Sequence, residues 1–156
     1  MKPFFATAIA AALLAAVAAS AQDASKPTAT PPPENEPYAP GLGEIMALQQ
    51  MRHIKLWFAG SAGNWPLADY ELDALNDGFD DLNRQLGGDT VETSVGAAIS
   101  ALEKAIAAKD RAAFANAFDG LSAGCNHCHR ALDHAFVVIK RPTLLPYSDQ
   151  HFAPRR

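Results

Sequence analysis

The sequence is poor in cysteine, and this scarcity limits the sites that thiols can build. The 156 residues include only two cysteines, Cys125 and Cys128. A structural zinc site typically takes four ligands, commonly from two such pairs. A disulfide across two intervening residues would close too small a loop to stabilise a fold much. Neither a zinc module nor a disulfide framework is therefore favoured.

Positive charge and strand-forming runs are scarce as well. Lys and Arg number 13 against 17 Asp and Glu, a formal charge of -4, so we expect no nucleic-acid partner. The one β-branched run, residues 137–139, is too short and isolated to make a sheet. Hydrophobic residues make up 49% of the chain, which is enough for the core of the single domain that this length suggests.

The longest apolar run lies at the N-terminus and is typical of an export signal. Lys2 is followed by an Ala-rich apolar stretch over residues 4–17 and by the small-x-small pattern of residues 19–21. A membrane span takes about 20 apolar residues, so an uncleaved anchor is the less favoured alternative. We expect residues 1–21 to be a cleaved signal peptide. The mature protein would then be periplasmic, with no stable membrane insertion.

The remaining sequence divides by composition into a linker, a helical domain and a tail. Residues 22–41 are rich in proline and small polar residues and are expected to be a disordered linker. Residues 42–139 carry apolar side chains at helical spacing, with short breaks between four amphipathic segments. Residues 140–156 contain three prolines and are expected to form an irregular tail. The predicted fold class is all-α, an up-and-down four-helix bundle.

The breaks between the segments set the expected helix bounds. Asn64 and Asp110 are good N-cap residues for the second and fourth helices. We expect helices over about 42–59, 65–86, 91–108 and 111–136.

The two cysteines belong to the motif Cys125-Asn126-His127-Cys128-His129, which is the attachment signature of a c-type haem. Cysteines at i and i+3 of a helix face the same way, one turn apart. That spacing suits two thioether bonds to one edge of a haem. His129 is then the proximal ligand of the iron. A thioredoxin-like redox pair would need a βαβ context, which the sequence lacks.

The stretch of residues 110–129, with this motif late in the last helix, resembles the class II c-type cytochromes, the cytochrome c-prime group. The resemblance covers about the last third of the domain. It implies periplasmic electron transfer for six-coordinate members, gas binding for five-coordinate ones, and a possible homodimer. It carries over Cys125, Cys128 and His129, but not the distal ligand. This chain also runs on for 27 residues after His129, whereas the family chain usually ends soon after the motif.

The distal ligand must come from the first helix, the antiparallel neighbour of the fourth. If the fourth helix ends at Phe136, the level opposite His129 is about residues 49–50. His53 is the first candidate near that level, and Met46 is the alternative. The remaining possibility is that the iron has no protein ligand on this side.

Three further residues of the first helix are candidates for the haem pocket. In the absence of a distal ligand, Leu56 or Trp57 would cover the iron. Trp57 is also a candidate wall of the pocket, and Arg52 a partner for the haem propionates.

The sequence therefore predicts one heme c and a one-electron carrier that serves redox partner proteins in the periplasm. The alternative is a five-coordinate haem protein that binds NO or CO. No catalytic acid-base pair is evident beside the expected iron, so no enzyme activity is predicted.

The motif predicts covalent attachment. Co-expressed with a haem-maturation system, the protein should carry one haem that remains on the chain in a denaturing gel. The variants Cys125→Ala and Cys128→Ala should each lose one thioether bond, measured by mass spectrometry and by the pyridine haemochrome spectrum. A wild-type chain without covalent haem under these conditions would rule out the cytochrome interpretation.

Overall fold

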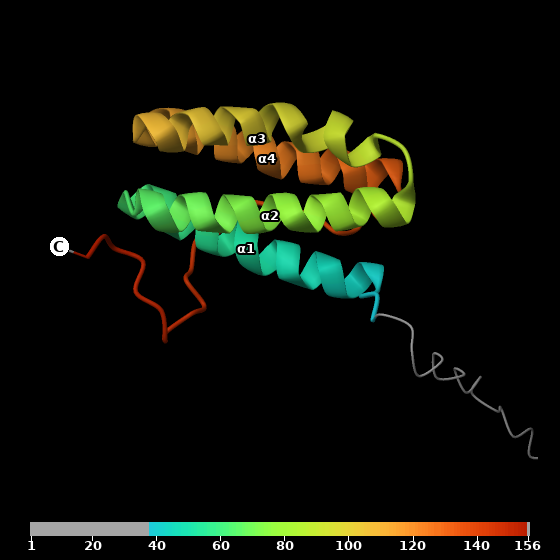
Figure 1. Cartoon of the computed structure of the whole chain (residues 1–156), viewed down its shortest axis with the longest axis horizontal. Coiled ribbons are helices and arrows are strands. Elements are labelled where there is room, and N and C mark those ends of the chain that lie inside the picture. Colours follow the sequence, from blue (N-terminus) through green and yellow to red (C-terminus); the bar gives the residue numbers. More distant parts are fainter. Residues whose placement is uncertain (1–37, 156) are drawn as a thin grey trace, which may run out of the picture. The chain divides into compact units, whose positions relative to one another are not determined.

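Four helices and their connections make up residues 38–155, the part of the chain that this computed structural model describes (Figure 1). These residues contain no strand, so the expected all-α class and the count of four helices are confirmed for them. The helices are α1 (Leu42–Ala62), α2 (Trp65–Leu86), α3 (Thr90–Ala108) and α4 (Arg111–Ala131). Within the described range, no helix is both long and apolar enough to cross a membrane.

The chain separates into two units, residues 1–37 and residues 38–156. The expected signal peptide, residues 1–21, and most of the expected linker, residues 22–41, lie outside the described residues.

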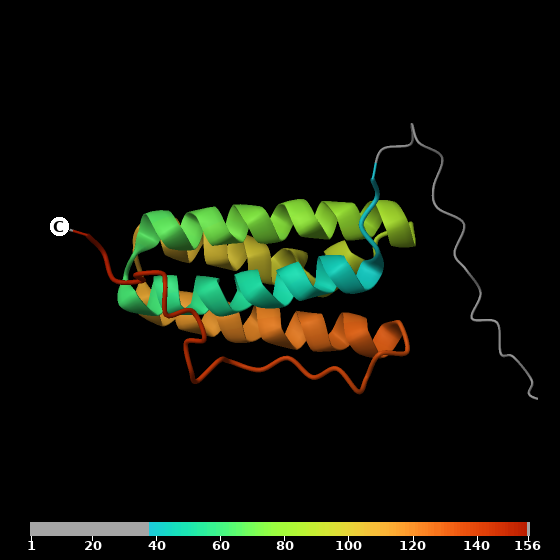
Figure 2. The same ribbon diagram turned by 90° about the horizontal axis from the view of Figure 1, so that it is seen from below.

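Consecutive helices lie antiparallel and side by side, so the chain runs up and down the bundle (Figures 1 and 2). The most extensive packing is within the pairs α1–α2 and α3–α4, whereas α1 and α4 touch less. Gly63 and Lys109 follow α1 and α3 with left-handed φ angles of 77° and 56°. A left-handed residue after a helix satisfies its last carbonyls and turns the chain. Short loops can therefore join antiparallel neighbours.

The helix bounds differ from the expected ones at two ends. α1 continues to Ala62, three residues past the expected end, because Gly63 and not Gly60 has the left-handed conformation. Asp110 caps α4 as expected, and its carboxylate accepts the backbone N–H groups of Ala112 and Ala113 at 2.9 and 3.0 Å. Asn64 is the N-cap residue of α2 as expected, but its side chain makes no capping hydrogen bond.

The largest correction concerns the end of α4, which was expected near Phe136. The helix ends at Ala131, and Asp133 takes a left-handed φ of 61°. The backbone N–H of His134 then bonds to the carbonyl of His129 at 2.7 Å, which closes the helix end. Residues 132–155 contain no helix or strand, so the tail begins about eight residues earlier than expected.

The tail turns back along the bundle instead of leaving it. Figure 2 shows it passing beside α4 and then reaching α1. Near its end Phe152 is buried, and its ring lies edge-on to Phe58 of α1 with centroids 6.3 Å apart.

Aromatic rings fill the core in the half of the bundle where α1 ends and α4 begins. Trp57, Trp65, Phe114 and Phe118 pack with ring centroids between 5.0 and 6.3 Å apart. The Phe114 ring lies so close to Gly60 that a Cβ on the glycine would overlap it. Such close packing leaves little room in this half.

Two glycines of α4 make a matched test of helix packing. A Cβ at Gly124 would overlap the backbone carbonyl of Ser94, whereas a Cβ at Gly120 would meet only Ala98 at an ordinary 3.6 Å. Gly124→Ala should therefore destabilise the fold by about 1–3 kcal/mol, because α3 must move away. Gly120→Ala should be neutral or stabilise by up to about 1 kcal/mol through helix propensity. Denaturant unfolding followed by circular dichroism measures both, and equal stability of the two variants would contradict this account.

Candidate functional site

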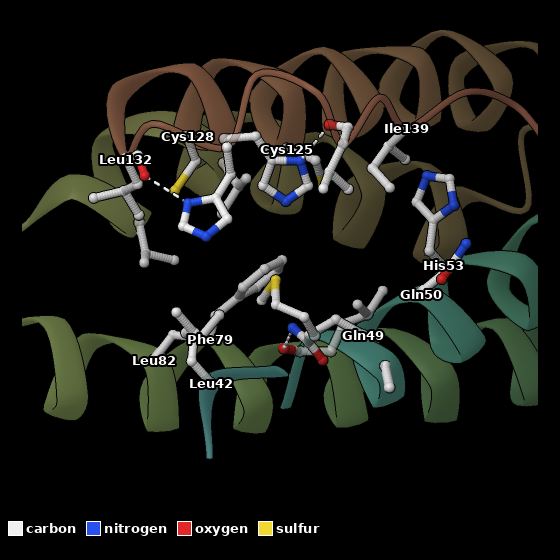
Figure 3. A pocket seen from close by; sticks show the side chains of 18 of the residues that line it. Leu42, Gln49, Gln50, His53, Phe79, Leu82, Cys125, Cys128, Leu132 and Ile139 are labelled. Carbon is white, nitrogen blue, oxygen red and sulfur yellow. Dashed lines mark hydrogen bonds between the residues drawn. The ribbon is translucent and has the colours of Figure 1, made fainter. Parts of the chain in front are cut away.

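A cavity of about 420 Å³ lies in the half of the bundle opposite the aromatic rings. Its size falls within the range of about 300–1,000 Å³ that is usual for sites of small ligands and cofactors. Side chains from all four helices and from the tail line it, and most of them are apolar (Figure 3). The lining residues are Leu42, Gly43, Met46, Ala47, Gln49, Gln50, His53, Leu75, Phe79, Leu82, Leu86, Val91, Val95, Leu121, Cys125, Cys128, His129, Leu132, His134, Val137 and Ile139.

Both cysteines lie on the α4 wall of this cavity (Figure 3). They are free thiols, one helical turn apart, and both are partly buried. Burial raises the pKa of Cys125 to about 12, with a smaller contribution from Cys128, and burial also raises the pKa of Cys128. A redox-active dithiol needs a lowered pKa to supply the attacking thiolate. The raised pKa values therefore argue against a thioredoxin-like role.

His129 stands in the same wall with one of its ring nitrogens already engaged. Its Nδ1 lies 2.8 Å from the backbone carbonyl oxygen of Val137 in the tail. A carbonyl can only accept, so Nδ1 carries the proton and donates it. The lone pair of Nε2 is then available to a metal, in the tautomer that histidine ligands commonly have.

Two contacts between α1 and α4 give the register of the two helices, from which the residue of α1 opposite His129 can be inferred. Trp57 packs on Phe118 with centroids 5.0 Å apart, and four residues earlier on α1 His53 meets Ser122, four residues later on α4. Continued for seven more residues on each helix, this register brings α1 to Met46 at the level of His129. The expected level of residues 49–50 was too far along α1, because it assumed that α4 reaches Phe136.

Met46 and His53 both line the cavity but lie at different levels along α1. Seven residues separate them along α1, which is roughly 10 Å at the rise of an α-helix. Met46 is partly buried and packs against the core.

His53 is buried, with 4% of its surface exposed, and already has a partner. Its Nε2 lies 2.9 Å from the Ser122 hydroxyl, which donates its own proton to the carbonyl of Phe118 at 3.1 Å. His53 therefore donates from Nε2. Burial lowers its pKa to about 4, so the ring is neutral at pH 7.

Arg52, Leu56 and Trp57, the other candidates on α1, do not line the cavity. The Arg52 guanidinium donates to the backbone carbonyl of Ala74 on α2. Leu56 is fully buried in the core. Trp57 lies among the aromatic rings, with the guanidinium of Arg141 over its face at 4.3 Å. The structure thus brings Met46, His53 and the motif to one cavity and places these three side chains elsewhere.

Gln49 and the tail also contribute to the cavity, and the sequence pattern did not predict the contribution of the tail. Gln49 is buried, and its amide donates to the carbonyl of Leu75 at 2.9 Å, which joins α1 to α2 at the cavity wall. His134, Val137 and Ile139 line the cavity from the tail. The β-branched run of residues 137–139 was the available signal for the tail, because such residues favour an extended backbone that packs on a surface.

The donor set can be tested against a haem and against a bare metal ion. Among residues 38–155, no group of three or more His, Cys, Asp or Glu side chains is placed to hold a metal ion. The cavity instead offers two thiols one turn apart, a histidine with a free Nε2, and the thioether of Met46 on α1. This set fits a covalently attached haem.

The chain matches no protein-family model, and searches of curated proteins and of solved structures found no match either.

The lowered pKa of His53 predicts a pH dependence of stability. Between pH 6.5 and about 4, the unfolded chain binds a proton at this histidine and the folded chain does not. The free energy of unfolding should therefore decrease as the pH falls through this window, by on the order of 3 kcal/mol from this group. Glu71, whose pKa is raised by burial, contributes with the opposite sign.

Comparison of His53→Leu with the wild type isolates the histidine, because Glu71 is present in both. The variant should lose much less stability between pH 6.5 and 4 in denaturant titrations. His151→Leu, at an exposed position in the tail, is the control and should keep the wild-type dependence. If His53→Leu keeps it too, the buried neutral histidine is not its cause.

Proposed function

We propose that this protein is an exported c-type cytochrome that carries one covalent haem and transfers single electrons in the periplasm. Cys125 and Cys128 would hold the haem through thioether bonds, and His129 would bind the iron through Nε2. The observation that carries the proposal is the place of Cys125, Cys128 and His129 together on the wall of a largely apolar cavity, with Nδ1 of His129 already bonded to Val137.

The distal side is better suited to Met46 than to His53. The register of α1 on α4 supports Met46 at the level of His129, and His53 lies roughly 10 Å farther along the helix. Because Nε2 of His53 donates to Ser122, this ring could offer only Nδ1 to an iron. We therefore place Met46 first and His53 second, the reverse of the order that the sequence suggested.

A bound haem would supply a one-electron couple whose potential depends on its axial ligands and its surroundings. In this chain, apolar side chains such as Leu75, Phe79 and Leu121 line the cavity. An apolar wall excludes water and disfavours the extra positive charge of the oxidised state, which raises the reduction potential. With Met46 and His129 both bound, the haem site would rearrange little between its oxidised and reduced states. These properties suit an electron carrier more than an enzyme.

Export and the redox partners belong to the same proposal. Lys2 and the apolar residues 4–17 support a cleaved signal peptide, and attachment of haem at this motif takes place outside the cytoplasm. The partners would be periplasmic redox proteins.

The visible spectrum of the purified protein tests the coordination. The wild type should be low-spin in both oxidation states, because Met46 and His129 both bind the iron. Met46→Ala should become high-spin and should bind CO readily. Met51→Ala changes the same residue type on the same helix, away from the cavity lining, and should stay low-spin.

Two results would change the assignment. A low-spin Met46→Ala protein together with a high-spin His53→Gln protein would identify His53 as the ligand. A wild-type protein that is high-spin and binds CO would overturn the electron carrier and favour the five-coordinate alternative that binds NO or CO.

A further inference from the structure

The tail after α4 is attached to the helix at the level of the motif. The carbonyl of Val137 accepts from Nδ1 of His129 at 2.8 Å. Two residues later, Ile139 bonds to the Asn126 side chain twice: its N–H donates to Oδ1 and its carbonyl accepts from Nδ2, both at 2.7 Å. The amide of Asn126 thus satisfies the backbone of Ile139 as a neighbouring strand would.

A second attachment lies farther along the tail at Arg141. Its guanidinium bonds to both carboxylate oxygens of Asp119, at 3.0 and 2.6 Å, and to the carbonyl of Ala115 at 3.3 Å. The same group lies over the Trp57 ring. A single exposed ion pair contributes little, but a two-pronged pair with a cation–π contact is held in one geometry. Residues 133–141, which we call the strap, are therefore fixed at both ends.

The strap is part of the cavity wall. His134, Val137 and Ile139 line the cavity, and Ile139 is half-buried. Asn126, which holds Ile139, occupies the first variable position between the two cysteines of the motif. Haem attachment requires only the two cysteines and the histidine at this spacing, so the motif itself does not call for an asparagine there.

A simpler role for the strap would be to close the C-terminus of α4. The N–H of His134 already does this through the carbonyl of His129, and the N–H of Leu132 through the carbonyl of Cys128. The two bonds from Asn126 are not needed for that purpose. Their effect is to fix the segment that presents the Val137 carbonyl.

We propose that the strap completes the haem site and that Asn126, acting through Ile139, is a positioning residue that keeps the Val137 carbonyl on the Nδ1–H of His129. This inference rests on the haem attachment proposed above. A carbonyl held on Nδ1 fixes the plane of the imidazole and makes Nε2 a stronger donor to the iron. Asn126 therefore controls the orientation of the His129 ring and the donor strength of its Nε2.

The test uses the holoprotein with Met46→Ala in all chains, so that the ferrous iron has His129 as its one protein ligand. Resonance Raman spectroscopy then measures the iron–histidine stretching frequency, and hydrogen exchange with mass spectrometry measures the strap. Adding Asn126→Ala should lower the stretching frequency and speed exchange in residues 133–141 about tenfold, since two hydrogen bonds are lost. Asn116→Ala, at an exposed asparagine of the same helix, should change neither.

Ile139→Pro is a second variant for the case in which Asn126→Ala does not fold. It keeps Asn126 and removes the Ile139 N–H, and it should shift both measurements in the same direction. Faster exchange without a change in the stretching frequency would show that the strap only covers the helix end, and would overturn the positioning role. Unchanged exchange would show that Asn126 does not hold the strap. Failure of the haem proposal is distinguishable, because covalent haem would then be missing from every chain, the Met46→Ala parent included.

Discussion

The fit of the Phe114 ring against Gly60 determines how α1 lies on α4. A side chain on that glycine would overlap the ring, so the two helices approach closely there because residue 60 has none. Further along, the same register pairs Trp57 with Phe118 and His53 with Ser122. Beyond those pairs the space between the helices is not filled by side chains, and the cavity lies there. The position of the cavity and the residue that faces His129 both depend on this close approach.

Burial shifts the pKa of two side chains that border the cavity. His53 has a pKa of about 4, and Cys125 has one of about 12, both because of burial. Burial also raises the pKa of Glu71 on α2, an effect opposed by the nearby charges of Lys55 and Arg52. Such shifts are the consequence of removing charged forms from water.

The tail gives this bundle a wall that a shorter chain would lack. Helix α4 ends at Ala131, two residues after the end of the cysteine motif, and Asp133 then adopts a left-handed conformation. The polypeptide then returns along α4, and its backbone meets the side chains of His129 and Asn126. A longer helix would have carried Val137 away from His129. The early end of α4 is therefore what allows the Val137 carbonyl to reach His129, and the proposed positioning of His129 depends on it.

The sequence by itself determined the four helices, because apolar residues recur at helical spacing in segments separated by glycine and aspartate. It also determined the geometry of Cys125, Cys128 and His129, since residues three and four apart on a helix share a face. The tertiary structure decided the end of α4, the register that brings Met46 to the level of His129, and the partner of Nδ1. Each of these depends on contacts between residues far apart in the chain, such as Asn126 with Ile139 or Gly60 with Phe114. Local patterns carry no record of such contacts, so only the packed molecule could show them.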